Sequence, residues 1–185
     1  MVVAKSELAL AALSAAFATR ELDRAYLALV WGVPSPLEGT IEGAIGRDPR
    51  DRKRMATVGR GGKPALTRFA VRQAWGVGAS LLECRLATGR THQIRVHLSS
   101  RGHPVVGDPL YLRRIPAAAR SVPEPARKAL LAFPRQALHA ARLRFVHPRT
   151  GDRLSFETPP PADFRELTEI LTRLDRGHRD SSGIA

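Results

Sequence analysis

Apolar residues along the chain follow two different spacings, and each spacing predicts its own kind of element. Short apolar or alternating runs predict strands over residues 24–31, 40–45, 66–75, 81–86, 138–146 and 154–157. Helical spacing predicts helices over 7–18, 91–100 and 162–174. Val2, Val3 and Ala4 are interpreted as the end of a further strand. Because strands fill the middle of the chain and helices stand apart from them, the pattern predicts an α+β fold with a mixed, mainly antiparallel β-sheet flanked by helices.

The segments between these elements predict one domain with two irregular regions. Residues 46–64 are expected to form a basic loop or hairpin, and residues 113–135, with their prolines and arginines, an exposed insertion. A chain of 185 residues fits a single domain of ordinary size. We expect this domain to cover residues 1–175 and to end in a polar, frayed tail at 176–185.

The charge of the chain narrows the choice of partner. Lys and Arg number 30 against 17 Asp and Glu, a net charge of +13, which favours a polyanion such as nucleic acid. The alternative is a basic background of solvated arginines. A single cysteine, Cys84, excludes an intrachain disulfide and suits a reducing cytoplasm. The sequence shows neither zinc-ligand spacing nor a glycine-rich phosphate loop, so no metal or cofactor is expected.

The densest polar stretch is Thr88-Gly89-Arg90-Thr91-His92-Gln93-Ile94-Arg95-Val96-His97-Leu98. A glycine turn that leads into a helix leaves backbone N–H groups free, which suits an anion. Arg95 is expected among apolar neighbours, where a buried guanidinium needs an anionic partner. The alternative is a solvated basic helix. The loop that follows, Gly102-His103-Pro104-Val105-Val106-Gly107-Asp108-Pro109-Leu110-Tyr111, is rigid, and Asp108 is interpreted as structural.

Together these two stretches resemble the signature of the RluA-type pseudouridine synthases, and more closely the RluD-like branch that acts on large-subunit ribosomal RNA. The likeness continues upstream in VVAK, RAYLALVWG and GTIEGAIGRDPRDRKRM, and downstream in ALHAARLRF, HPRTG and LSFETPPPADF. It covers nearly the whole chain except residues 113–135 and the C-terminal tail. The resemblance implies a cofactor-free, cytoplasmic isomerase, expected to be a monomer, that converts uridine to pseudouridine within RNA.

The resemblance also implies roles for individual residues. Tyr26 matches the tyrosine that contacts the base and accepts a proton, and Arg95 matches the arginine that pairs with the nucleophilic aspartate. We expect both to face one cleft. A positive rim of the 47–63 loop and Arg90 is expected beside it. The residues expected to bind RNA are Lys53, Arg54, Arg90, Thr91, His92 and Gln93.

The nucleophile itself has no counterpart in the 185 residues. The family's His-Arg-Leu-Asp segment lies a few residues before VVAK, which here begins at Val2, so the aspartate is expected upstream of Met1. We therefore expect a chain truncated at its N-terminus, without its first strands, and inactive alone. Arg173-Leu174-Asp175 resembles part of that segment at the wrong place, and a circular permutation is not favoured. Two alternatives remain: an RNA-binding pseudoenzyme that lacks the aspartate, and a basic, ribosome-associated structural protein.

Overall fold

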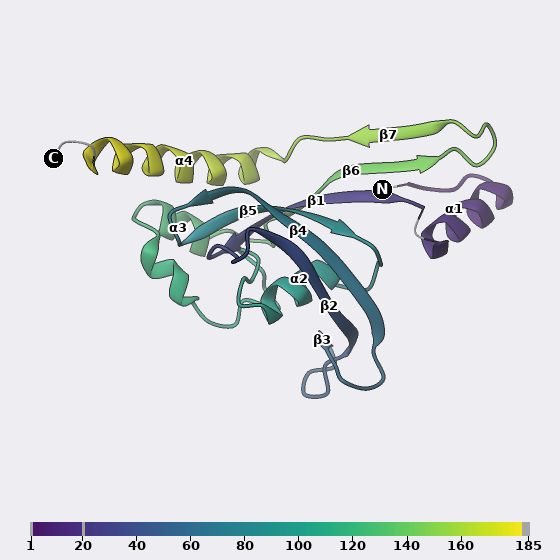
Figure 1. The fold of residues 1–185 in the computed structure, drawn as a ribbon, viewed down its shortest axis with the longest axis horizontal. Coiled ribbons are helices and arrows are strands. Elements are labelled where there is room, and N and C mark those ends of the chain that lie inside the picture. Colours follow the sequence, from purple (N-terminus) through teal and green to yellow (C-terminus); the bar gives the residue numbers. More distant parts are fainter. Residues whose placement is uncertain (1, 20, 183–185) are drawn as a thin grey trace.

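A computed structural model describes residues 2–19 and 21–182 of the chain, with side chains as far as Arg176 (Figure 1). The helices are α1 Glu7–Thr19, α2 Gln93–Ser100, α3 Ala126–Leu131 and α4 Ala162–Ser182, with a 3₁₀ helix at Ala117–Ser121. The strands are β1 Asp23–Trp31, β2 Glu38–Arg47, β3 Met55–Thr57, β4 Lys63–Trp75, β5 Ala79–Leu86, β6 Leu138–Val146 and β7 Arg153–Glu157.

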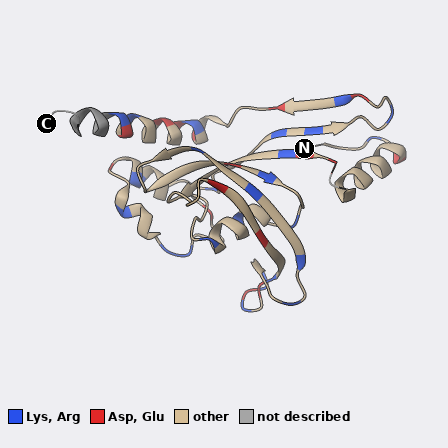
Figure 2. Cartoon of the chain, in the orientation of Figure 1, with Lys and Arg blue, Asp and Glu red and all other residues tan. Residues whose placement is uncertain are grey.

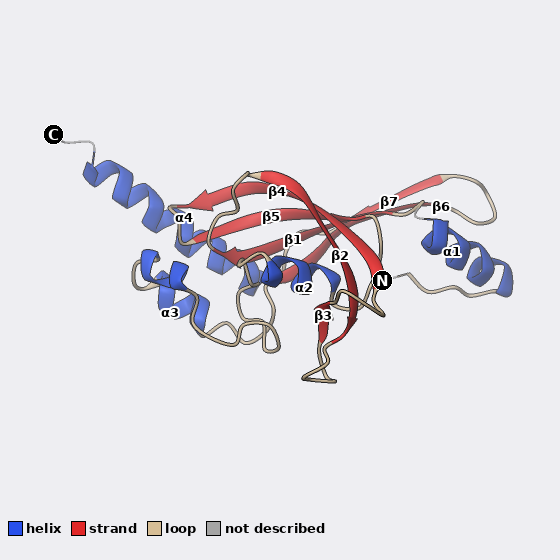
Figure 3. Ribbon diagram, turned by 60° about the horizontal axis from the view of Figure 1, so that its bottom comes forward, coloured by secondary structure: helices blue, strands red, loops and turns tan. Residues whose placement is uncertain are grey.

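The strands form one 7-stranded sheet in the order β3-β2-β4-β5-β1-β6-β7. Every pairing in the described sheet is antiparallel, which confirms the predicted α+β class and sharpens it. Because β1 is nearly continuous in apolar residues, it lies inside the sheet between β5 and β6. The sheet twists strongly, with α1 beside the β6–β7 turn and α3 and α4 toward the other end (Figures 1 and 3).

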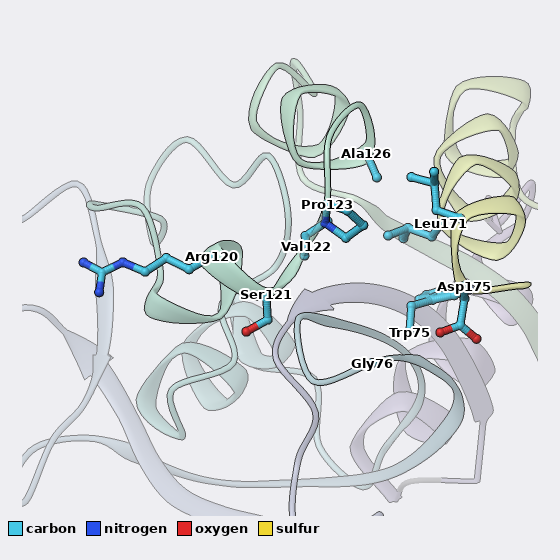
Figure 4. Close-up of a pocket in the computed structure, with 10 residues that line it drawn as sticks. Trp75, Gly76, Arg120, Ser121, Val122, Pro123, Ala126, Leu171 and Asp175 are labelled. Carbon is cyan, nitrogen blue, oxygen red and sulfur yellow. The ribbon is translucent and has the colours of Figure 1, made fainter. Parts of the chain in front are cut away.

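The main core lies where the sheet meets the segment 113–135 and α4. Its largest fully buried side chains include Trp31, Leu82, Leu130 and Phe164. The indole of Trp75 donates a hydrogen bond of 3.0 Å to Thr172 Oγ1, which ties the end of β4 to α4. Beside this contact, a cavity of about 240 Å³ opens between the end of β4, the segment 120–126 and α4 (Figure 4).

The prediction of an exposed insertion at 113–135 is wrong. The segment contains the 3₁₀ helix and α3, and five of its apolar side chains are buried: Ala119, Val122, Ala126, Leu130 and Phe133. These residues recur every three or four positions, which is helical spacing. Prolines and arginines stand between these apolar positions in the sequence, and they hide the helical spacing from a reading of the composition.

Three further boundaries differ from the sequence predictions. Val2–Ala4 is not a strand in the structure, because no neighbouring strand pairs with it; Val2 and Ala4 instead pack near Leu13 and Phe145. The predicted loop or hairpin at 46–64 is a hairpin, in which the short strand β3 pairs with the end of β2, and the strands β2 and β4 extend into the two ends of this segment. The helix α4 continues through Gly177 and the rest of the predicted tail as far as Ser182, and residues 183–185 lie outside the described residues.

The buried face of α3 can be tested with adjacent leucines. Leu130 is fully buried whereas Leu131 is 39% exposed. Replacing Leu130 by Ala removes buried methyl groups and leaves a cavity, so Leu130→Ala should lower the free energy of unfolding by about 2–5 kcal/mol. Leu131→Ala is the matched control and should cost well under half of that. Urea unfolding followed by circular dichroism measures both, and equal small losses would show that α3 is not part of the core.

Candidate functional site

The turn that leads into α2 is held by the side chain of Gln93. Its amide oxygen accepts hydrogen bonds from the Thr88 hydroxyl at 2.7 Å and from the Arg90 backbone N–H at 3.0 Å. Its amide nitrogen donates to Leu66 O at 2.9 Å and to Thr67 Oγ1 at 3.0 Å. Only 2% of Gln93 is exposed, so the geometry does not support its expected contact with RNA. Gln93 instead fixes the turn against β4.

Arg95 is buried in a bidentate ion pair. Its Nε and Nη2 donate to the two carboxylate oxygens of Asp108, each at 2.7 Å. The sequence argument that a buried guanidinium needs an anionic partner is therefore confirmed, and the partner is Asp108. The pair joins α2 to the loop that follows it. Arg95 Nη1 makes no hydrogen bond with the described residues, so one nitrogen of the guanidinium remains available.

The backbone before and after Asp108 places its carboxylate. Gly107 has a φ of +68°, and a Cβ there would lie 2.1 Å from Arg135 O, so only glycine fits. The Asp108 carboxylate also accepts the backbone N–H groups of Leu110 at 2.9 Å and Tyr111 at 3.0 Å. Burial alone would raise the pKa of Asp108, but Arg95 and these N–H groups outweigh burial and hold that pKa below its usual range. Asp108 is thus an ionised structural partner.

Tyr111 lies between two guanidinium groups. Arg95 and Arg54 are each 4.9 Å from the centre of its ring, a cation–π distance. The Tyr111 hydroxyl accepts the Met55 backbone N–H at 3.0 Å and lies 3.0 Å from His92 Nδ1. Tyr111 therefore connects β3, α2 and the Asp108 loop. Sequence reasoning gave this residue no role, although its place three residues after Asp108 was the available signal.

The residues expected to bind RNA divide into exposed and packed groups. Lys53 and Thr91 are exposed, and Arg90 is partly buried with its Nε donating to Pro64 O at 3.2 Å. The Arg54 side chain is only 12% exposed because it packs on Tyr111, so the structure does not support its place on an open rim. His92, in the left-handed conformation at φ 57°, binds Tyr111 and is half-buried.

Basic residues are not confined to the predicted rim (Figure 2). Lys and Arg also occur on the strands β1, β4 and β6, and α4 carries both basic and acidic residues (Figure 2). Arg142 lies 3.3 Å from the Asp23 carboxylate, and Arg135 donates to Asp163 at 2.7 Å. Part of the positive charge is therefore engaged in ion pairs and does not form a continuous surface.

Tyr26 lies on β1, on the sheet face that α2 covers. Tyr26 pairs with Cys84, and Cys84 pairs with Phe69, so these three side chains share a face. Thr67 lies on the same face of β4 as Phe69, and it is 2.9 Å from His97 Nδ1 on α2. Tyr26 and α2 are therefore on one side of the sheet, as expected.

A cleft common to Tyr26 and Arg95 stays a prediction. Tyr26 lines a cavity of about 490 Å³ together with Phe17, Arg24, residues 140–143 of β6 and Phe156 of β7. The guanidinium of Arg95 contacts Asp108 and Tyr111, and Arg95 does not line that cavity. The Tyr26 hydroxyl makes no hydrogen bond with the described residues, so it is free to meet a ligand in the cavity.

The expected position of the nucleophilic aspartate, upstream of Met1, also stays a prediction. Met1 itself lies outside the described residues, so the structure does not test what adjoins it. Within the described residues, the carboxylate that Arg95 binds is that of Asp108, and both of its oxygens are engaged. Asp108 therefore does not take the place of the expected nucleophile.

The described residues contain no group of three or more His, Cys, Asp or Glu side chains arranged for a metal ion. Among the helices that the structure describes, none combines the length and the apolar character needed to cross a membrane.

Comparison with known proteins places this arrangement in a family. The sequence model of the RNA pseudouridylate synthases matches residues 1–100, which include Tyr26 and Arg95. The chain belongs to the RNA pseudouridylate synthase family. Its match with the human RNA pseudouridylate synthase domain-containing 1 structure has 30% identity and a TM-score of 0.65, over 92% of this chain and 74% of that one. The human domain-containing 4 structure, at 24% identity and a TM-score of 0.72, shares the fold over 93% of this chain and 70% of its own.

Similar bacterial proteins carry a more specific name. Ribosomal large subunit pseudouridine synthase D of Neisseria meningitidis is 46% identical over 96% of this chain and 46% of its own length. The protein of the same name from Zymomonas mobilis is 44% identical over 92% of this chain and 52% of its own. The chain thus spans about half the length of the curated relatives that it matches.

The ion pair between Arg95 and Asp108 can be tested by removing one charge. Asp108→Asn leaves a buried guanidinium without its counter-charge, which should lower the free energy of unfolding by about 3–5 kcal/mol. The control is Glu169→Gln, which breaks an exposed pair with Arg173 and should cost less than about 1 kcal/mol. Denaturant unfolding at pH 7 measures both losses. Equal losses in the two variants would contradict a structural role for the buried pair.

Because His97 is buried, we expect the protein to lose stability in mild acid. Burial lowers the pKa of its fully buried ring below the ordinary 6.5, and the backbone of Gly43 only partly opposes this. As pH falls below 6.5, the unfolded chain therefore binds a proton that the folded chain does not, so stability should decrease from there down to the folded pKa. Burial also lowers the pKa of His92, so both histidines contribute in this window.

The variant His97→Asn isolates the contribution of His97, and its asparagine can keep a hydrogen bond to Thr67. Its unfolding free energy should depend less steeply on pH below neutrality than that of the unchanged chain, whatever its absolute stability. His92→Asn serves as the comparison. Thermal melts across mildly acidic to neutral pH measure the slopes, and an unchanged slope in His97→Asn would contradict this assignment.

Proposed function

We propose that this chain is the greater part of a catalytic domain that isomerises uridine to pseudouridine in large-subunit ribosomal RNA. The observation that carries the proposal is the 44–46% identity, over nearly the whole chain, with proteins named ribosomal large subunit pseudouridine synthase D. The net charge of +13 suits an RNA substrate. On this proposal the domain works in the cytoplasm, as a monomer, without a cofactor.

The reaction conserves every atom of the substrate. The bond between N1 of uracil and C1′ of the sugar breaks, the base turns, and a bond from C5 to C1′ replaces it. The proton on C5 leaves and N1 gains one. In the proposed mechanism a carboxylate attacks the flipped nucleotide as the bond to N1 breaks, and it is released as the bond from C5 to C1′ forms. Tyr26 accepts the proton from C5. The exposure of Tyr26 to a cavity of about 490 Å³ supports its contact with the base.

Arg95 is proposed to hold the attacking carboxylate. Its Nε and Nη2 are engaged by Asp108, so Nη1 is the nitrogen that would receive a second carboxylate. A guanidinium beside a carboxylate lowers the pKa of that carboxylate and keeps it ionised for attack. Asp108 would then serve to orient Arg95, because its own oxygens already accept hydrogen bonds from Arg95, Leu110 and Tyr111.

The nucleophilic aspartate is proposed to lie upstream of Met1, outside the 185 residues. Asp108 is committed to Arg95, and Asp175 lines the cavity beside Trp75, which Tyr26 does not line (Figure 4). Neither is therefore placed to attack a nucleotide at Tyr26. The second candidate function, an RNA-binding protein without isomerase activity, is favoured if no such aspartate accompanies this chain.

Activity assays separate these two functions. The 185-residue chain should form no pseudouridine on large-subunit ribosomal RNA, and a version extended upstream by a His-Arg-Leu-Asp segment should form it. Changing that Asp to Asn should abolish activity, and Tyr26→Phe in the extended protein should lower turnover by about 10²–10⁴-fold with RNA binding retained. Digestion followed by chromatography measures the product, because pseudouridine and uridine have the same mass. Turnover by the 185-residue chain itself would contradict the proposed origin of the nucleophile.

A further inference from the structure

Arg24 carries a charge that no described residue balances. The side chain is half-buried on β1, and its Nε is shielded from solvent without a hydrogen-bond partner. Its side-chain neighbour is the ring of Phe17, whose centre lies 5.3 Å from the guanidinium carbon. An aromatic face offsets only part of the cost of removing a guanidinium from water. The arrangement therefore leaves room for an anion.

The nearby carboxylates are turned toward other arginines. Asp23 precedes Arg24 on the strand and so points to the opposite face of the sheet. Its carboxylate lies 3.3 Å from Arg142 and 4.0 Å from Arg144. Glu157 lines the same cavity as Arg24 but binds Arg144 at 3.1 Å. Asp23 and Glu157 are thus engaged by arginines other than Arg24.

The position of Arg24 relates it to Tyr26. Two residues apart on one strand, they share a face and are separated by roughly 7 Å, a spacing within the reach of a single nucleotide. Both line the cavity of about 490 Å³. Gly89 gives the guanidinium its space, because a Cβ there would lie 2.8 Å from Arg24 Nη1 and 3.4 Å from Nη2. A side chain at position 89 would therefore displace the guanidinium.

We propose that Arg24 binds a backbone phosphate of the nucleotide whose base lies against Tyr26. This inference rests on the proposed function and adds a substrate contact to it. A planar guanidinium matches the oxygens of a phosphate, and the negative charge supplies the partner that Arg24 lacks. Phe17 lines the same cavity and contacts the guanidinium, and Gly89 accommodates the guanidinium at close range.

The test measures how RNA binding depends on salt. The probe is a short oligocytidylate with one central uridine, titrated by fluorescence anisotropy at several salt concentrations. Each phosphate contact contributes about 0.7 to the slope of log affinity against log salt for a single strand. Arg24→Met should therefore show a slope that is shallower by about 0.7 than that of the unchanged chain. Arg149→Met removes one charge from an exposed position in the β6–β7 turn and is the matched control, with little change expected.

A modified probe separates a phosphate contact from a structural role. Replacing one phosphate beside the uridine by a neutral methylphosphonate should weaken binding by the unchanged chain several-fold and leave Arg24→Met unaffected. Arg24→Lys should retain part of the sensitivity. Gly89→Ala keeps the charge of Arg24 but crowds its guanidinium, so its binding should no longer respond to the methylphosphonate. This variant replaces Arg24→Met in the test if Arg24→Met does not fold.

Each outcome decides a different point. Equal sensitivity of the unchanged chain and Arg24→Met to the methylphosphonate overturns the inference and leaves the proposed function standing. The same holds if Arg149→Met changes the slope as much as Arg24→Met does, since net charge then explains the loss. If inorganic phosphate at millimolar concentration competes as well as RNA does, the site is a general anion site and the inference is overturned. If no form of the chain binds the probe, the proposed function fails and the inference falls with it.

Discussion

The bidentate contact between Arg95 and Asp108 is the interaction on which the geometry of the site depends. It joins α2 to the loop after it, and Tyr111 extends the connection to β3 through the Met55 backbone. A buried ion pair adds little net stability, because the cost of removing both charges from water offsets most of their attraction. Its effect here is to fix the orientation of the Arg95 guanidinium. Two of its nitrogens bind Asp108, and the third makes no hydrogen bond with the described residues.

The sheet sets the positions of Arg24 and Tyr26, the two residues proposed to contact the nucleotide. β1 is paired on both sides, so the positions of Arg24 and Tyr26 are set by two neighbouring strands. The register against β6 shifts between Ala25 and Tyr26, a local irregularity that increases strand twist at this point. A strand that is paired on both sides holds its side chains in fixed positions, and the proposed roles of Arg24 and Tyr26 depend on such positioning.

Many of the protein's basic residues are engaged in contacts within the fold. Arg54 and Arg95 stack on Tyr111, Arg135 binds Asp163, and Arg142 binds Asp23. These side chains contribute to the net charge without offering an open surface. Lys53 and Thr91 remain exposed, and Arg24 faces a cavity with its charge unbalanced. A count of charges therefore indicates the class of partner but not the residues that touch it.

The sequence by itself determined the family, the α+β class and the approximate strands, because these follow from local periodicity and from motifs that are contiguous in the chain. Even the need of Arg95 for an anion followed from its apolar neighbours. Only the tertiary structure identified Asp108 as that anion. It also showed that Gln93 and the side chain of Arg54 are largely buried, and that apolar residues of the segment 113–135 belong to the core. Each of these depends on contacts between residues that folding brings together, and the burial or partner of a side chain is decided by such contacts. The environment of Arg24 is likewise visible only in the structure, where Asp23 contacts Arg142 and Gly89 lies beside the guanidinium.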